Sequence, residues 1–196
     1  MPKVSTQTSN LLPALFQRFS AGQAVTVFHI GAALPETVEF FSDYRCKLHF
    51  IDVFPALPIV LTEDGALTPL QQFQELLQFS ADTFFDVCLF WDLFNFLDSE
   101  AIAALQAVLR PHLKQNSLAH AFSVHNRKTP QKHHVYGIQQ LDTLNVRSRR
   151  TTPPCYAPHS QRALTALLDD FRVERSVLLP DSRLELLLQR QHNSQD

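Results

Sequence analysis

Strand-like and helix-like segments alternate along most of the chain. Short runs rich in β-branched and aromatic residues occur at 25–30, 47–53, 85–91 and 117–124. Segments with apolar residues at helical spacing occur at 35–44, 68–79, 99–113 and 159–171. Parallel neighbouring strands need a long crossover connection, usually a helix, whereas antiparallel neighbours need only a short turn. The alternation therefore predicts a mostly parallel sheet with helices on both faces.

The two ends of the chain depart from this alternation. Residues 172–190 contain two strand-like runs around a Pro-Asp-Ser turn, which predicts a terminal hairpin. Such a hairpin places one antiparallel strand in the sheet. Residues 9–19 predict a short amphipathic helix with Ser9 or Asn10 as its cap.

The length and composition of the chain suit a single domain. It has 196 residues, of which 45% are hydrophobic, and this is enough for one proper core. We expect residues 1–196 to form one domain, with a helical N-terminal segment at 1–22. Residues 126–158 combine several prolines with most of the local basic residues, and we expect this segment to be irregular.

Net charge and cysteine use argue against several classes of protein. A net charge of −2 creates no overall field that favours nucleic acid or anionic lipid. Cys46, Cys88 and Cys155 are far apart and form no C-x-x-C pair, so we expect reduced thiols and neither a zinc site nor a disulfide framework. No signal-peptide region and no run of about 18 apolar residues is present. We expect a soluble, cytoplasmic protein without a membrane partner.

A basic segment at 126–150 stands out from the acidic body of the chain. Against the single acid Asp142, it carries Arg127, Lys128, Lys132, Arg147, Arg149 and Arg150. A solvated loop is the favoured interpretation, and contact with an acidic or nucleic-acid substrate is the alternative. Nucleic acid is not favoured, because no aromatic residues that would stack on bases are interleaved with the charges. Adjacent histidines at His133 and His134 cannot easily face one ion, so we expect no metal site.

Four stretches of the chain resemble the class I S-adenosylmethionine-dependent methyltransferases. They read "VTVFHIGAA", "LHFIDVF", "FDVCLFWDLFNFLDSEAIAALQAVLRPHLKQNSLAHAF" and "FRVERSVLLPDSRLELLLQR", and the resemblance covers residues 24–190. It implies a Rossmann-like sheet with strand order 2-1-4-5-7-6 in the family's labels and strand 7 antiparallel. The interval between the second and fourth strands holds only one clear helix, so the family's strand 3 is expected to be shortened or lost.

The resemblance also implies a site for S-adenosyl-L-methionine at the carboxyl ends of the strands. The implied cofactor-binding residues are His29, Gly31, Ala32, Ala33, Asp52, Val53, Trp91 and Asp92. His29 stands where the family usually has an acid, and alanines stand where further glycines are usual, so we expect a reduced cofactor loop. Asp52 would accept hydrogen bonds from the ribose hydroxyls. The alternatives are a solvated acid for Asp52, core packing for Trp91, and a cap or turn for Asp92.

We consider three functional hypotheses, of which the first two rest on the resemblance and the third on the basic segment 126–150. The first is an S-adenosylmethionine-dependent methyltransferase of unknown acceptor, with residues 126–150 beside the acceptor. Methyl transfer depends mostly on proximity and orientation, so the lack of an obvious catalytic acid or base does not count against it. The second is a non-catalytic binding or scaffold protein of the same fold, which the reduced loop supports. The third is a nucleic-acid-binding module, and the acidic remainder of the chain disfavours it.

Overall fold

The computed structural model describes residues 4–62, 67–126, 128, 130, 132 and 134–191. Its strands are β1 (Val4–Thr8), β2 (Val25–Ile30), β3 (Cys46–Ile51), β4 (Phe85–Trp91), β5 (Leu113–Val124), β6 (His134–Gln140), β7 (Thr143–Ser148), β8 (Phe171–Leu178) and β9 (Arg183–Arg190). Its helices are α1 (Leu12–Phe16), α2 (Pro35–Ser42), α3 (Pro69–Leu76), α4 (Ser99–Leu109) and α5 (Gln161–Leu167). Short 3₁₀ turns follow β3 at Phe54–Ala56 and β4 at Leu93–Asn95.

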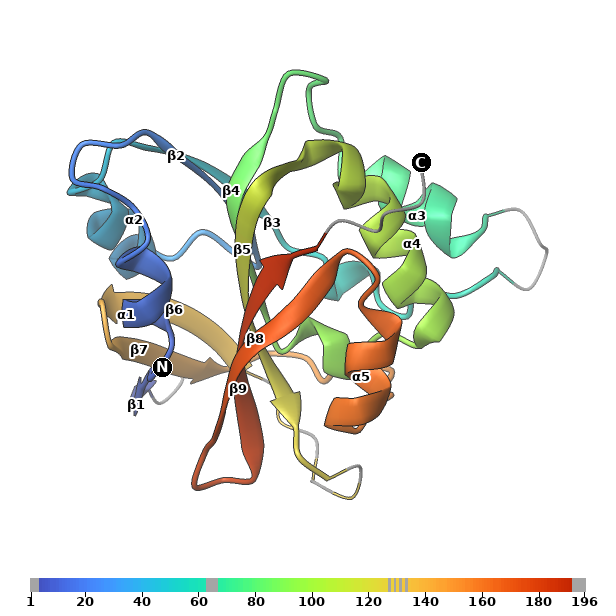
Figure 1. The fold of residues 1–196 in the computed structure, drawn as a ribbon. Helices are drawn as coiled ribbons and strands as arrows, with labels where there is room; N and C mark the ends of the chain where they lie inside the picture. Colours follow the sequence, from blue (N-terminus) through green and yellow to red (C-terminus); the bar gives the residue numbers. More distant parts are fainter. Residues whose placement is uncertain are drawn as a thin grey trace.

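A six-stranded sheet with the order β3-β2-β4-β5-β9-β8 forms the centre of the molecule (Figure 1). β2 pairs in parallel with β3 and β4, and β4 pairs in parallel with β5. β9 is antiparallel to both β5 and β8. This confirms the predicted strand order, the adjacency of 25–30 with 85–91, and the terminal hairpin.

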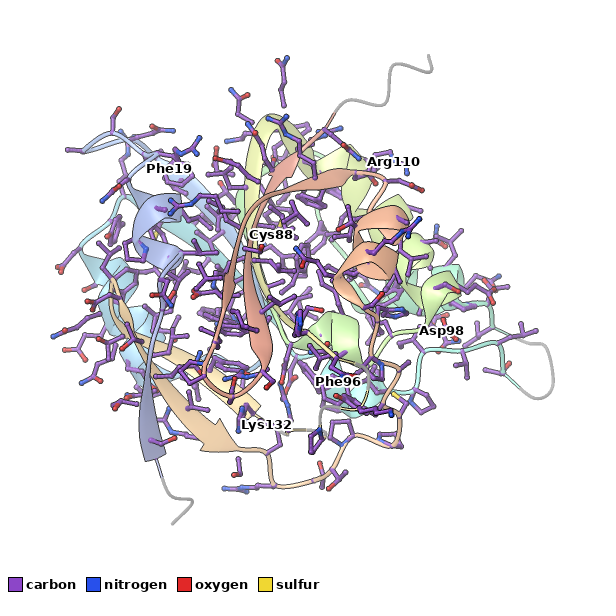
Figure 2. The ribbon with its side chains drawn as sticks, turned by 60° about the horizontal axis from the view of Figure 1, so that its bottom comes forward. Phe19, Cys88, Phe96, Asp98, Arg110 and Lys132 are labelled. Atoms are coloured by element: carbon purple, nitrogen blue, oxygen red, sulfur yellow. The ribbon has the colours of Figure 1, made fainter. Side chains whose placement is uncertain are left out.

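Two cores cover the two faces of this sheet. Every residue of β4 is buried, which explains why its sequence is apolar except at Asp86. Successive side chains of a strand point to opposite faces. Cys88 therefore joins the core that contains Phe73 of α3, while Leu89 joins the core that contains Phe41 of α2. Figure 1 shows α1 and α2 on one side of the sheet and α3, α4 and α5 on the other, and Figure 2 shows Cys88 near the centre of the molecule.

The sheet ends at β3 on one side. In the described residues between β3 and β4, namely 52–62 and 67–84, there is a 3₁₀ turn and α3 but no strand. This agrees with the expectation that the family's strand 3 is shortened or lost. The ends of β3 and β4 are consequently bordered by loops on that side and not by a further strand.

The expectation that residues 126–158 are irregular is wrong. β6 and β7 form an antiparallel hairpin inside this range, and β1 joins them in a three-stranded sheet of order β1-β7-β6. Alternate residues of the hairpin are buried, including Tyr136, Ile138, Leu144 and Val146. This alternation is a strand signal that the basic residues and flanking prolines obscured.

The expectation that residues 1–22 are helical is also wrong in part. Residues 4–8 form β1, and the helix covers only Leu12–Phe16. The backbone N–H groups of Asn10 and Leu11 donate to the carboxylate of Glu185 on β9, at 2.8 and 3.2 Å. This buried carboxylate holds the N-terminal end of α1 against the large sheet, which a local pattern could not reveal.

The small sheet packs against α2. The N–H of Ile138 donates to Oγ1 of Thr37 over 3.0 Å, and Arg147 forms an ion pair with Glu36. These contacts fix the end of β7 beside the first turn of α2. The chain that leaves β7 therefore passes over the carboxyl ends of β3 and β4.

Candidate functional site

A cleft opens at the carboxyl edge of the parallel strands. Gly31 follows β2, Asp52 follows β3 and Asp92 follows β4, and because these strands are parallel their ends meet at one edge of the sheet. Ligands of open α/β sheets bind outside this edge. The cleft has a volume of about 400 Å³, and its lining includes Asp52, Phe54 and Leu57 on one side and Arg149, Arg150 and Thr151 on the other.

Asp52 is the predicted residue that lines this cleft. About a third of its side chain is exposed, and one carboxylate oxygen accepts a hydrogen bond from the N–H of Phe54 at 3.3 Å. Nη1 of Arg149 lies 3.9 Å from the same oxygen, which is longer than a hydrogen bond. The Asp52 carboxylate therefore keeps capacity to accept hydrogen bonds from a ligand.

The backbone at Gly31 has a conformation that favours glycine. Its φ is +125°, a region that side chains strongly disfavour, and its N–H donates to the carbonyl of Ile51 over 2.8 Å. Ala32 and Ala33 follow in exposed positions, and α2 begins at Pro35. The predicted loop is thus short, and its backbone requires a glycine at position 31.

His29 and Trp91 face the core beneath the cleft. Nε1 of Trp91 donates to Nε2 of His29 over 3.1 Å, and both side chains are about 1% exposed. Trp91 also stacks on Tyr136, with ring centroids 5.3 Å apart and planes 16° apart. Burial lowers the pKa of His29 to about 3, so this residue is neutral at pH 7. It supplies no negative charge in the place of the acid that is usual there.

Val53 and Asp92 are buried as well. Val53 packs entirely inside the core. The side chain of Asp92 is only 4% exposed, and burial raises its pKa to about 6, against the opposing effect of Arg149. Asp92 is therefore a carboxyl group with a strongly altered pKa at the end of a central strand, which is typical of functional sites.

Arg149 connects the two acids and was not expected here. Its Nη2 lies 3.9 Å from Oδ1 of Asp92, and its Nη1 lies 3.9 Å from Oδ1 of Asp52. Its guanidinium carbon lies 3.3 Å from the centre of the Phe54 ring, close enough for a cation–π contact. The side chain is 9% exposed, and its Nε has no hydrogen-bond partner. The charge of residues 126–150 was noticed in the sequence, but only the β6–β7 hairpin explains how Arg149 reaches the strand ends.

Comparison with known proteins identifies the fold. No family model matches the chain, and no curated protein matches its sequence. Among solved structures, an S-adenosylmethionine-dependent methyltransferase from Mesorhizobium loti has a TM-score of 0.54 over 93% of this chain and 98% of its own, at 10% identity. The chain has a Rossmann-like methyltransferase fold.

Two further structures extend the comparison. The 1,6-didemethyltoxoflavin-N1-methyltransferase of Burkholderia thailandensis, with bound S-adenosylhomocysteine, has a TM-score of 0.52 over 93% of this chain and 78% of its own, at 14% identity. The pyocyanin biosynthetic protein PhzM is longer, and this chain spans 55% of its length, at 14% identity and a TM-score of 0.47. At 14% identity, the likeness to the Burkholderia enzyme concerns the fold alone.

Two other sequence expectations concern metals and membranes. In the described part of the chain, no three His, Cys, Asp or Glu residues gather where they could hold a metal ion, while His133 lies outside that part, as does Arg127. None of the helices found in the described residues has both the length and the apolar character needed to cross a membrane.

Proposed function

We propose that the chain is an S-adenosylmethionine-dependent methyltransferase that binds its cofactor in the cleft at Asp52. The observation that carries this proposal is the meeting of Gly31, Asp52 and Asp92 at the carboxyl edge of a methyltransferase-type sheet. Gly31 has a positive φ that leaves the turn after β2 without a side chain, and Asp52 has a partly exposed carboxylate at the end of the next strand. An acid in this place suits the two hydroxyls of a ribose.

The residues of the cleft suit an adenosyl group. Asp52 would accept the ribose hydrogen bonds, and the backbone at Gly31 would approach the amino-acid end of the cofactor. Phe54 and Leu57 offer apolar surface beside Asp52 for a purine ring. When bound, the cofactor supplies an activated methyl group on a positively charged sulfur. The chain itself contributes orientation and the exclusion of water.

Asp92 is the proposed general base. With a pKa of about 6 it is mostly ionised at pH 7, and it can accept a proton from a hydroxyl or amine that is being methylated. It also borders a cavity of about 10 Å³ together with Asn95 and Lys132, so an acceptor would reach Asp92 only after the surrounding side chains move. Residues 126–150 remain the proposed contact for an acceptor whose identity is unassigned.

A second candidate function is a binding or scaffold role without catalysis. The position of Arg149 favours it, because this cation already satisfies the charges of Asp52 and Asp92. The reduced loop favours it too, since His29 is neutral and buried.

A thermal-shift titration distinguishes the two functions. We expect both S-adenosylmethionine and S-adenosylhomocysteine to raise the melting temperature of the wild-type protein, by an amount that grows with the logarithm of the ligand concentration above the dissociation constant. Asp52→Asn should reduce both shifts, because it weakens charge-assisted hydrogen bonds to the ribose. Asp43→Asn is the matched control, since Asp43 is exposed at the end of α2. If millimolar ligand shifts neither the wild type nor the control, the scaffold role replaces the enzymatic one.

A further inference from the structure

We propose that Arg149 is an internal occupant of the cofactor cleft, and that an adenosyl ligand must displace the segment 149–154 in order to bind. We call residues 149–154 the arginine arm. This inference rests on the proposed function, because it concerns the access of the cofactor to the same cleft. Arg149 would thus reduce the affinity of the cleft for its ligand by occupying the cleft in the unbound protein.

Arg149 uses the groups that a bound cofactor would need. Its guanidinium lies 3.9 Å from the Asp52 carboxylate, the proposed ribose acceptor, and 3.3 Å from the centre of the Phe54 ring, the proposed purine surface. Arg149 makes no hydrogen bond to Asp52, so the competition is for space: the guanidinium covers the Phe54 ring and fills the position beside the Asp52 carboxylate that a ribose would take. Ligand and arm therefore compete for the same two side chains.

The interactions of Arg149 are suited to exchange. Both ion pairs are 3.9 Å long, beyond hydrogen-bond length, and Nε of Arg149 has no partner. A tightly anchored arginine would make short, bidentate bonds to a carboxylate. Arg149 instead neutralises two acids from a distance, so its departure from the cleft breaks no short hydrogen bond to either carboxylate.

The arginine arm can move while its two ends stay fixed. On one side, Arg147 pairs with Glu36, and β7 is held in the small sheet. On the other side, Sγ of Cys155 donates to the carbonyl of Phe96 over 3.1 Å, and the N–H of Ala157 donates to the carbonyl of Asn95 over 2.9 Å. Residues 149–154 form no helix or strand between these anchors, but Pro153 is buried, so the movement is centred on residues 149–152. Displacement of the arm requires no change in either sheet.

Charge determines which ligand gains most when the arm leaves. Arg149 is the strongest cationic influence on the buried Asp92 carboxyl, with Arg183 as a weaker one. Once Arg149 is gone, a positively charged sulfonium replaces part of the missing charge, whereas the neutral thioether of S-adenosylhomocysteine does not. Removal of Arg149 should therefore favour S-adenosylmethionine over S-adenosylhomocysteine.

Calorimetric titration of three variants tests this inference. Arg149→Gln should bind S-adenosylmethionine about tenfold more tightly than the wild type and S-adenosylhomocysteine by a smaller factor. Arg149→Lys, which keeps the charge but loses the planar stacking group, should give a smaller gain. Arg175→Gln is the matched control, since Arg175 is an exposed arginine on β8 that does not line the cleft, and it should change affinity by less than about twofold. Equal gains in the Arg149→Gln and Arg175→Gln variants would reduce the effect to net charge and overturn the inference.

Hydrogen exchange on the wild-type protein gives an independent readout. Saturating S-adenosylhomocysteine should leave β6 and β7 protected and should not slow amide exchange at residues 149–152, the part of the arginine arm that carries backbone N–H groups. Slower exchange in the arm on binding would contradict displacement. Binding that is unchanged by Arg149→Gln would refute the competition but leave the proposed function intact. No binding at millimolar ligand in either protein would refute both.

Discussion

The indole Nε1 of Trp91 donates a hydrogen bond to Nε2 of His29 over 3.1 Å, and this bond joins the ends of the adjacent strands β2 and β4. Nδ1 of His29 has no hydrogen-bond partner, and Trp91 has a positive φ of +51°. A bulky residue rarely adopts such a φ, so packing around the indole must hold the backbone there. The pair is thus a structural support below the cleft. Its hydrogen bond requires a neutral His29, because only an unprotonated Nε2 can accept it.

Acid should destabilise the protein through His29. Its pKa is 6.5 in the unfolded chain and about 3 in the folded protein, so the unfolded state binds the proton more tightly. The stabilisation is complete above pH 6.5 and is lost as the pH falls toward 3, with a total on the order of 5 kcal/mol. His29→Phe should flatten this pH dependence, and the orphaned indole N–H should cost about 1–3 kcal/mol at pH 7.

Urea unfolding followed by the fluorescence of the single tryptophan, at a series of pH values, measures both effects. The exposed His125→Gln serves as the control and should keep the wild-type slope. If the free energy of unfolding depended on pH in the same way in the wild type and in His29→Phe, protonation of His29 would not contribute to acid destabilisation.

Asp92 should act on stability in the opposite direction. Burial raises its pKa from 3.8 to about 6, so the folded state binds the proton more tightly than the unfolded state. The stabilisation that the protonated carboxyl contributes is complete below pH 3.8 and is lost as the pH rises through 6. Ionisation of Asp92 thereby lowers the free energy of unfolding by about 3 kcal/mol at pH 7. Asp92→Asn should therefore raise the free energy of unfolding at pH 7 and change it little at pH 4. A variant that is less stable than the wild type at pH 7 would contradict this expectation.

Glu185 should anchor the N-terminal segment as a carboxylate. Its side chain is fully buried, accepts hydrogen bonds from Asn10 and Leu11, and lies 2.8 Å from Nε2 of His120. Despite the opposing effect of burial, these contacts lower its pKa to about 2, with the hydrogen bond to His120 the largest of them. Its stabilisation is present above pH 4.5 and is lost as the pH falls toward 2.

Glu185→Gln should cost about 3–5 kcal/mol at pH 7, because it breaks a buried charged network. Amide exchange should show the first loss of protection in α1. A variant with wild-type stability and unchanged exchange at residues 10–12 would show that the network does not hold the helix.

Gly31 should resist substitution because of its backbone and not for lack of space. A methyl group at this position would meet only the His29 ring, at 3.7 Å, but the φ of +125° is strained for any side chain. We expect Gly31→Ala to lower the free energy of unfolding by about 1–3 kcal/mol. Gly22→Ala, at φ +78° in open space, should cost less, because alanine tolerates the left-handed region better. Equal losses in chemical denaturation would argue against special strain at Gly31.

The large sheet could be predicted because its strands have clear sequence signatures. β4 is buried on both faces and is apolar nearly throughout, so its limits at Phe85 and Trp91 follow from the sequence. The crossover helices likewise reveal their apolar faces and caps, as the Asp98 side chain shows by accepting from the N–H of Ala101. Local patterns of this kind need no knowledge of distant contacts.

The small sheet and Arg149 could not be placed in this way. The β6–β7 turn consists of Leu141 and Asp142, which lack the glycine or asparagine that usually marks a two-residue hairpin. β1 pairs with β7 across most of the chain, and this pairing leaves no local trace. The position of Arg149 between Asp52 and Asp92 depends on all of these tertiary contacts. The sequence does predict Asp52 at the edge of the sheet, because this residue lies at the end of the predicted strand 47–53.

A crystal structure with S-adenosylhomocysteine tests the central claim most directly. The account predicts the ribose hydroxyls within hydrogen-bond distance of the Asp52 carboxylate, the purine beside Phe54, and Arg149 moved away from both. A ligand bound at another place on the molecule would contradict the proposed site. A ligand in the cleft with Arg149 still between Asp52 and Asp92 would contradict the competition between arm and cofactor.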